Sequence, residues 1–169
     1  LLDRLREVKT GAELRVLGRA VDITVEAHRQ VARSIVPGMH EYEAEAVIEY
    51  VFKRNGAAHP GFPSIVGSGE NSIMLHYDTN RRVTHAGDLV VMDVGASYRG
   101  YTADITRTVP VDGRFTKEQR AVYDIVLEAQ EAALRAVKAG ASFGAPGEAA
   151  SRVLTRGLAR LGLIDGSQD

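Results

Sequence analysis

The feature that most restricts the fold is a pair of amphipathic helices that occurs twice along the chain. Apolar spacing predicts helices over residues 12–35, 41–53, 116–138 and 146–161. The segment DITVEA at residues 22–27 matches DIVLEA at residues 124–129, an offset of 102 residues. The glycines that end the second helix of each pair, Gly56 and Gly162, are offset by 106 residues. We therefore expect a domain built from two similar halves.

Both first helices begin with the same N-terminal signal. Thr10 is followed three residues later by Glu13, and Thr116 is followed three residues later by Gln119. This spacing is typical of a capping box, in which each side chain accepts a hydrogen bond from the backbone of the other residue.

Strands are expected only after the first helix pair. Residues 57–110 contain a short strand at 64–66, a second in the run SIMLHY, and a hairpin from Val90 to Val109. After the second pair only LIDGSQD remains. We expect the chain to stop where a second set of strands would begin.

Two aspartates lie in the otherwise apolar hairpin VVMDVGASYRGYTADITRT. With a turn centred on Tyr98 and Arg99, residues whose numbers add to 197 face each other, and these include Asp93 and Asp104. Opposed side chains on an antiparallel pair lie roughly 4.5–5.5 Å apart, where like charges repel. The pair can hold one divalent ion or bridge two ions about 3.5–4 Å apart. Alternatively, one aspartate lies in the turn and the other is a solvated surface charge.

His76 differs from the other four histidines because it is expected in an apolar strand beside this hairpin. Its side chain can be a third metal ligand, a donor to a substrate oxygen or a satisfied core histidine. We expect His28, His40 and His59 to be solvated, and His85 to be structural or exposed. Arg107 is expected to form a structural ion pair.

Composition excludes several functional classes. The 169 residues carry a net charge of −1 without a block of like charge, which disfavours nucleic acid and anionic membranes as partners. The chain has no cysteine, so it has no disulfide or thiolate site, which fits a cytoplasmic location. With 44% hydrophobic residues it can bury one substantial core.

The sequence resembles the Xaa-Pro aminopeptidases and prolidases, which are metallopeptidases of the pita-bread (creatinase/aminopeptidase) fold. The resemblance rests on LHY at 75–77, on GSGEN at 67–71 and above all on residues 87–134, which include DVG and GYTADITRT. It implies an α+β pita-bread fold with its first half complete and its second half cut off before the strands.

The resemblance also implies the chemistry. Asp93 and Asp104 would be two of five ligands to two divalent ions, commonly Mn²⁺, with Co²⁺ or Zn²⁺ as alternatives, and the other ligands would lie beyond residue 169. A metal-held hydroxide would cleave the bond between an N-terminal residue and proline. His76 would contact the substrate without binding metal. A homo-oligomer is expected for the full-length protein.

The expected organisation is a linker at residues 1–10, from a missing N-terminal domain, and a partial catalytic domain at 11–169. Residues 11–110 form the first αβ repeat and 116–169 the helices of the second. This segment alone is expected to be inactive. Two other functions stay open: a non-catalytic pita-bread domain that binds peptides or proteins, and a small structural α+β domain with solvated hairpin charges.

Overall fold

The computed structural model describes residues 2–165. The chain divides into two compact units, Leu1–Arg114 and Phe115–Asp169. None of the described helices is long and apolar enough to cross a membrane.

In the part of the first unit that the structure describes there are three α-helices, one 3₁₀ helix and six strands. The helices are α1 (Leu2–Glu7), α2 (Gly11–Ser34) and α3 (Glu41–Arg54), followed by a 3₁₀ helix, η1 (Gly69–Ile73). The strands are β1 (His59–Pro60), β2 (Ile65–Ser68), β3 (Leu89–Val94), β4 (Ala96–Tyr98), β5 (Tyr101–Thr102) and β6 (Ile105–Pro110). They form two antiparallel sheets with the orders β2-β3-β6 and β1-β4-β5.

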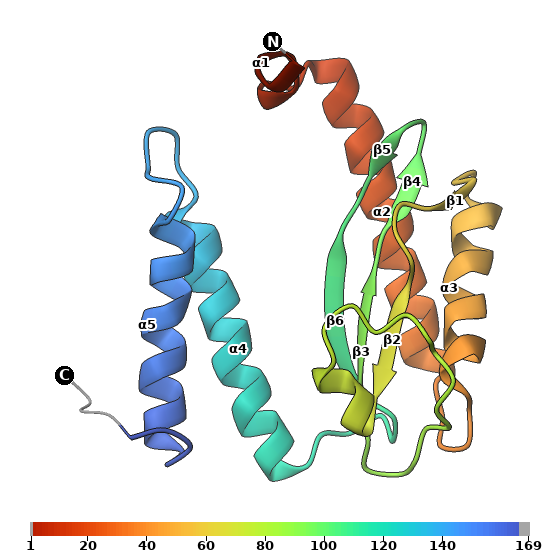
Figure 1. Ribbon diagram of the computed structural model, residues 1–169, viewed down its shortest axis with the longest axis vertical. Helices are drawn as coiled ribbons and strands as arrows, with labels where there is room; N and C mark the ends of the chain where they lie inside the picture. The colour runs from red at the N-terminus through yellow and green to blue at the C-terminus, as the bar shows by residue number, and fades with distance from the viewer. Residues whose placement is uncertain (1, 166–169) are drawn as a thin grey trace. The chain divides into compact units, whose positions relative to one another are not determined.

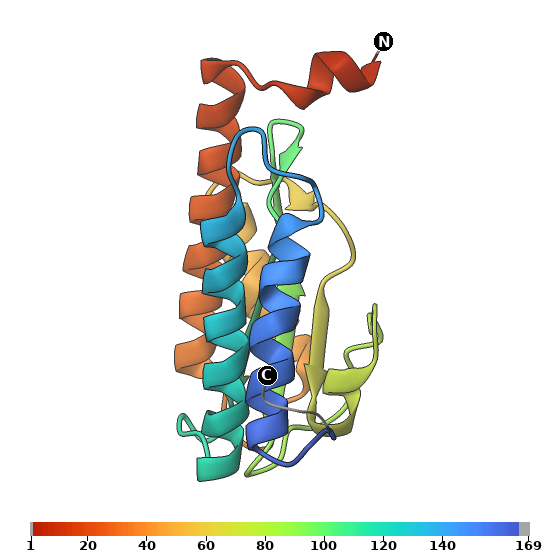
Figure 2. The same ribbon diagram turned by 90° about the vertical axis from the view of Figure 1, so that its left-hand side faces the viewer.

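Helices α2 and α3 pack side by side and cover one face of the β2-β3-β6 sheet (Figure 1). The side view places α2 and η1 on opposite sides of β2 (Figure 2). Alternation along β3 explains this layering, because Val90, Met92 and Val94 are fully buried in the core between the sheet and the two helices. Asp93 points to the other face, away from α2 and α3.

The second unit is a helix pair, α4 (Lys117–Ala136) and α5 (Ala145–Arg160), that pack against each other. All four predicted long helices are confirmed, with ends within two residues of those expected. Both predicted capping boxes are also present, at Thr10 with Glu13 and at Thr116 with Gln119. The assignment of residues 1–10 as a linker stays a prediction, although α1 lies within it.

The predicted hairpin register was wrong by two residues. Asp93 lies opposite Thr106, and the turn is centred on Arg99 and Gly100, with φ of 51° and 82°. These values are those of a type I′ hairpin turn, which needs positive φ at both central residues. Glycine adopts positive φ freely, whereas the predicted centre would have imposed it on Tyr98. A shift of two keeps every side chain on its expected face, whereas a shift of one would have reversed it.

The hairpin is also interrupted, because Gly95 on one arm and Ala103-Asp104 on the other lie outside the strands. At Gly95 the backbone passes so close to the other arm that an added Cβ would lie 1.7 Å from the carbonyl oxygen of Ala103. Because Gly95 has no side chain, the backbone at Ala103 can lie this close to it, and this approach sets the position of the neighbouring Asp104.

The predicted strand SIMLHY is absent from the structure. Its first residues, Ser72 and Ile73, belong to η1, and a turn follows at Met74 to His76. Ile73, Met74 and Leu75 are 85%, 54% and 92% exposed. The apolar run indicated a buried strand. Instead, Gly69 at φ 51° and the hydrogen bonds of Ser68 and Asn71 to Glu41 turn the chain away from the sheet.

We expect Gly95→Ala to destabilise the protein by about 1–3 kcal/mol or more, because the new methyl group overlaps the Ala103 carbonyl. Urea unfolding measures the change. Gly18→Ala is the control: it is exposed on α2 with open space around it, and should stabilise by up to about 1 kcal/mol. Equal stabilities of the Gly95→Ala variant and the wild type would contradict the close crossing.

Candidate metal centre

The two hairpin aspartates, Asp93 and Asp104, line one cavity on the face of the sheet that is turned away from α2. The cavity has a volume of about 270 Å³. Its lining residues are Phe62, Pro63, Ile65, His76, Asp78, Asp93 and Asp104. Four of these side chains can bind cations or donate hydrogen bonds, and the other three form an apolar wall.

Asp93 and Asp104 come together although their backbones are not directly paired. Asp93 is half-buried in β3, and Asp104 lies in the break between β5 and β6, diagonally across the hairpin. Burial raises the pKa of Asp104, and the charge and hydrogen bonding of Asp93 raise it further. The raised pKa of Asp104 therefore reflects repulsion between the two carboxylates.

An orphaned oxygen shows that this pair fits a bound cation. Oδ1 of Asp93 is buried and has no hydrogen-bond partner among the described residues. A buried carboxylate oxygen without a partner is costly, and a divalent ion between Asp93 and Asp104 would remove both that cost and the repulsion. Within residues 2–165 no group of three or more His, Cys, Asp or Glu side chains could hold a metal ion. By themselves, the two aspartates would supply only part of a coordination shell.

His76 lines the same cavity from the turn after η1. Its side chain is exposed, and it forms no hydrogen bond or ion pair with another described residue, so both ring nitrogens are available. Its backbone has a φ of 54°, in the left-handed region that residues with a side chain rarely adopt. The structure therefore brings together His76, Asp93 and Asp104, and their chemical roles stay predictions.

One other histidine departs from expectation. His28 was expected to be solvated, but it is only 8% exposed, and its Nε2 lies 2.9 Å from the carbonyl oxygen of Ile105. Burial lowers the pKa of His28, and the nearby charge of Arg107 acts in the same direction. His28 thus joins α2 to the start of β6. Arg107 forms no ion pair with the rest of the described chain, so its expected structural pairing is absent.

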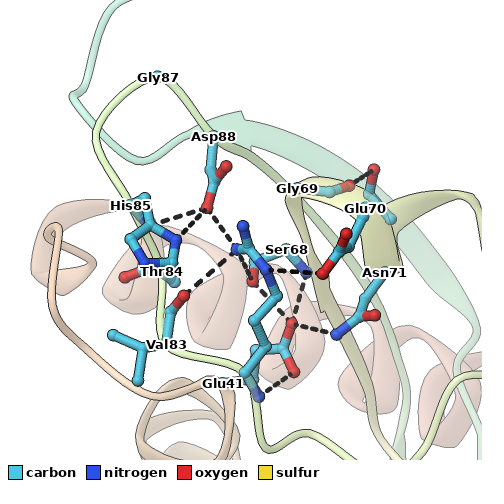
Figure 3. Close-up of polar contacts among 12 residues, drawn as sticks. Glu41, Ser68, Gly69, Glu70, Asn71, Val83, Thr84, His85, Gly87 and Asp88 are labelled. Carbon is cyan, nitrogen blue, oxygen red and sulfur yellow. Dashed lines mark hydrogen bonds and ion pairs between the residues drawn. The ribbon is translucent and has the colours of Figure 1, made fainter.

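The sequence reasoning missed Glu41, the first residue of α3. Its carboxylate is fully buried and accepts hydrogen bonds from Ser68, Asn71, Tyr77 and Arg82. Figure 3 shows Ser68 and Asn71 directed at this carboxylate. Burial raises the pKa of Glu41, but the hydrogen bonds from Ser68, Tyr77 and the Arg82 backbone outweigh it and hold that pKa below its ordinary value of 4.5.

An ion pair beside this network fixes the chain that leads into β3. The Arg82 guanidinium donates to Asp88 and to the hydroxyl of Ser68, which itself donates to Glu41. Asp88 also accepts from the backbone N–H of His85 (Figure 3). In the sequence, Glu41 resembled an ordinary first-turn acid, and the number of donors between residues 68 and 82 was the only signal of a buried acceptor.

Comparison with known proteins places this geometry in a family. The model of metallopeptidase family M24 matches residues 15–166. The chain is 43% identical to the Xaa-Pro aminopeptidase of Escherichia coli K12, over 100% of this chain and 38% of that protein. It is 39% identical to human Xaa-Pro dipeptidase, over 97% of this chain and 34% of that protein.

A solved structure shares the fold. Pseudomonas aeruginosa aminopeptidase PepP superposes with a TM-score of 0.96 at 41% identity, covering 99% of this chain and 39% of that one. The mixed α+β fold is thus that of the aminopeptidase P structures, as predicted. The chain spans less than two-fifths of the length of each of these three proteins.

Glu41→Gln should destabilise the first unit by about 1–3 kcal/mol near neutral pH, because an amide N–H₂ would replace one acceptor oxygen beside buried donors. Since the folded pKa of Glu41 is depressed, its stabilisation is present above pH 4.5 and is lost as pH falls through that lower pKa. The stability difference between wild type and variant should therefore shrink in acid. Chemical denaturation from pH 7 to pH 3 measures it, and parallel stability curves would contradict the network.

Proposed function

This chain belongs to metallopeptidase family M24, and we propose that it carries the two-aspartate part of the metal centre of a proline-specific exopeptidase. The proposed reaction is hydrolysis of the bond between an N-terminal residue and a proline in the second position of a peptide. One observation carries the proposal: the Asp93–Asp104 pair, with its orphaned buried oxygen, lines a cavity together with His76. The similarity to Xaa-Pro aminopeptidases and dipeptidases supports the choice of substrate.

In this proposal Asp93 and Asp104 hold divalent ions. Manganese is the proposed ion, with cobalt or zinc as alternatives, because two carboxylates offer hard oxygen ligands. When bound, such ions supply Lewis-acid activation of water and of the scissile carbonyl. The partnerless Oδ1 of Asp93 supports its role as a ligand.

His76 and the apolar wall would bind the peptide. A ring N–H of His76 can donate to the substrate carbonyl oxygen and stabilise the charge that develops there. Phe62, Pro63 and Ile65 offer apolar surface to a proline ring or an apolar first side chain. A binding domain without catalysis would gain nothing from two adjacent carboxylates, which favours the enzyme. Homo-oligomeric assembly and a cytoplasmic location complete the proposal.

His76→Ala should lower turnover of an Xaa-Pro peptide by about 10²-fold or more, the typical cost of losing one transition-state donor. Its metal content should match that of the wild type, because His76 is proposed to contact the substrate alone. Asp93→Asn and Asp104→Asn should lose both metal and activity. Metal analysis and release of the first residue, in the protein that contains this chain, provide the measurements, with an Xaa-Ala peptide as the control substrate.

A His76→Ala protein that loses its metal would make His76 a ligand. Variants of Asp93 and Asp104 that keep full activity would exclude the proposed centre.

Residues 1–169 alone should bind manganese weakly, with a Kd above about 10⁻⁴ M, because no third suitable side chain joins the two aspartates among the described residues. Isothermal titration calorimetry with MnCl₂ measures the affinity, and the Asp93→Asn variant provides the blank. Micromolar affinity together with turnover of an Xaa-Pro peptide would show that this chain builds a complete site by itself.

A further inference from the structure

The turn that carries His76 has little support of its own. Ile73, Met74 and Leu75, which precede His76, are exposed, and Ile73 is the last residue of η1, a single short 3₁₀ segment. Ser72 and Met74 bond only to nearby residues within the same segment. Yet His76 is held in the left-handed region at φ 54°. An uncommon backbone conformation persists only where the surroundings impose it.

Glu41 binds the chain on both sides of this turn. Before it, the backbone N–H and hydroxyl of Ser68 each donate to Oε1 of Glu41 at 2.7 Å, and the Asn71 amide donates at 3.3 Å. After it, the Tyr77 hydroxyl donates to Oε2 at 2.7 Å and the Arg82 N–H at 2.9 Å. Tyr77 directly follows His76, so one buried carboxylate holds both ends of the exposed segment.

Glu41 is itself rigidly placed. It is the first residue of α3, its backbone N–H donates to the carbonyl of Arg82, and the same helix buries Ala44 and Ile48 completely in the core. Because α3 is held in the core, the Glu41 side chain fixes the turn relative to the core. Glu41 is not among the residues that line the cavity, so it would affect His76 without contacting the substrate.

We propose that Glu41 is a positioning residue for His76, which holds the His76 ring at the cavity by fixing both ends of its turn. This inference rests on the proposed function, in which His76 contacts the substrate. Glutamine at position 41 has nearly the same size and can still accept from Ser68 through its carbonyl oxygen. Its N–H₂ group would face the Arg82 N–H, and two donors cannot bond to each other. The end of the turn after His76 should then be released.

A double-mutant cycle in the protein that contains this chain tests the proposal. Glu41→Gln should lower kcat for an Xaa-Pro peptide by about tenfold or more, within the 10²-fold loss expected for His76→Ala, and should change KM less than about twofold. Because Glu41 acts through His76, the double variant should match His76→Ala alone. The proposal is overturned if Glu41→Gln costs the same factor with and without His76, or if it leaves kcat unchanged.

Glu43→Gln is the matched control. Glu43 is an acid in the same helical turn, but it is exposed and bonds only to His40, so its variant should keep the wild-type kcat. If Glu41→Gln does not fold, Tyr77→Phe removes one hydrogen bond to Glu41 and should show the same dependence on His76, with a smaller loss.

An NMR measurement separates this inference from the proposed function. In protein with labelled histidine rings, Glu41→Gln should shift or broaden the His76 ring signal and leave that of His59 unchanged. An unchanged His76 signal overturns the positioning role whatever the activity. A wild-type protein that cleaves no Xaa-Pro peptide, while the His76 signal still responds to Glu41→Gln, overturns the proposed function alone.

Discussion

The alternation of side chains along β3 is the constraint on which the rest of the first unit depends. Val90, Met92 and Val94 are fully buried against α2 and α3, so the intervening Asp93 must point to the opposite face. A pairing shift of one residue would bury Asp93 in the core and expose Met92, and both changes would lower the stability of the folded state. One strand thus builds the core and presents the carboxylate, and the covering helices need supply nothing to the cavity.

Two carboxylate environments in the same unit show opposite physics. The buried carboxylate of Glu41 accepts several hydrogen bonds, which stabilise its charge and lower its pKa. Asp104 lies beside Asp93, whose buried Oδ1 has no partner in the described chain, and the pKa of Asp104 is raised. At Glu41 the charge is fully hydrogen-bonded, and these bonds hold the backbone of the neighbouring segments in place. The second environment leaves a buried oxygen without a partner beside a like charge, which is the property expected of a metal ligand pair.

The sequence predicted the elements that depend on local signals and failed where distant groups decide. Helix ends and both capping boxes followed from residues three or four apart. In the hairpin, each side chain lies on the predicted face of the sheet although the predicted register was wrong. The apolar run at Ile73 to Leu75 is typical of a strand, and periodicity cannot show that Glu41, some thirty residues earlier, holds the residues on both sides of it. The burial of His28 likewise depends on a carbonyl in β6, 77 residues away.

Locating the metal in the protein tests whether Asp93 and Asp104 form the proposed centre. Crystals of the protein that contains this chain, grown with manganese and measured at the manganese absorption edge, would give an anomalous difference map. We expect density between the carboxylates of Asp93 and Asp104, with an oxygen of Asp93 among the ligands and the His76 ring near but not bound. An anomalous peak elsewhere, with the two aspartates bound only to water, would contradict it.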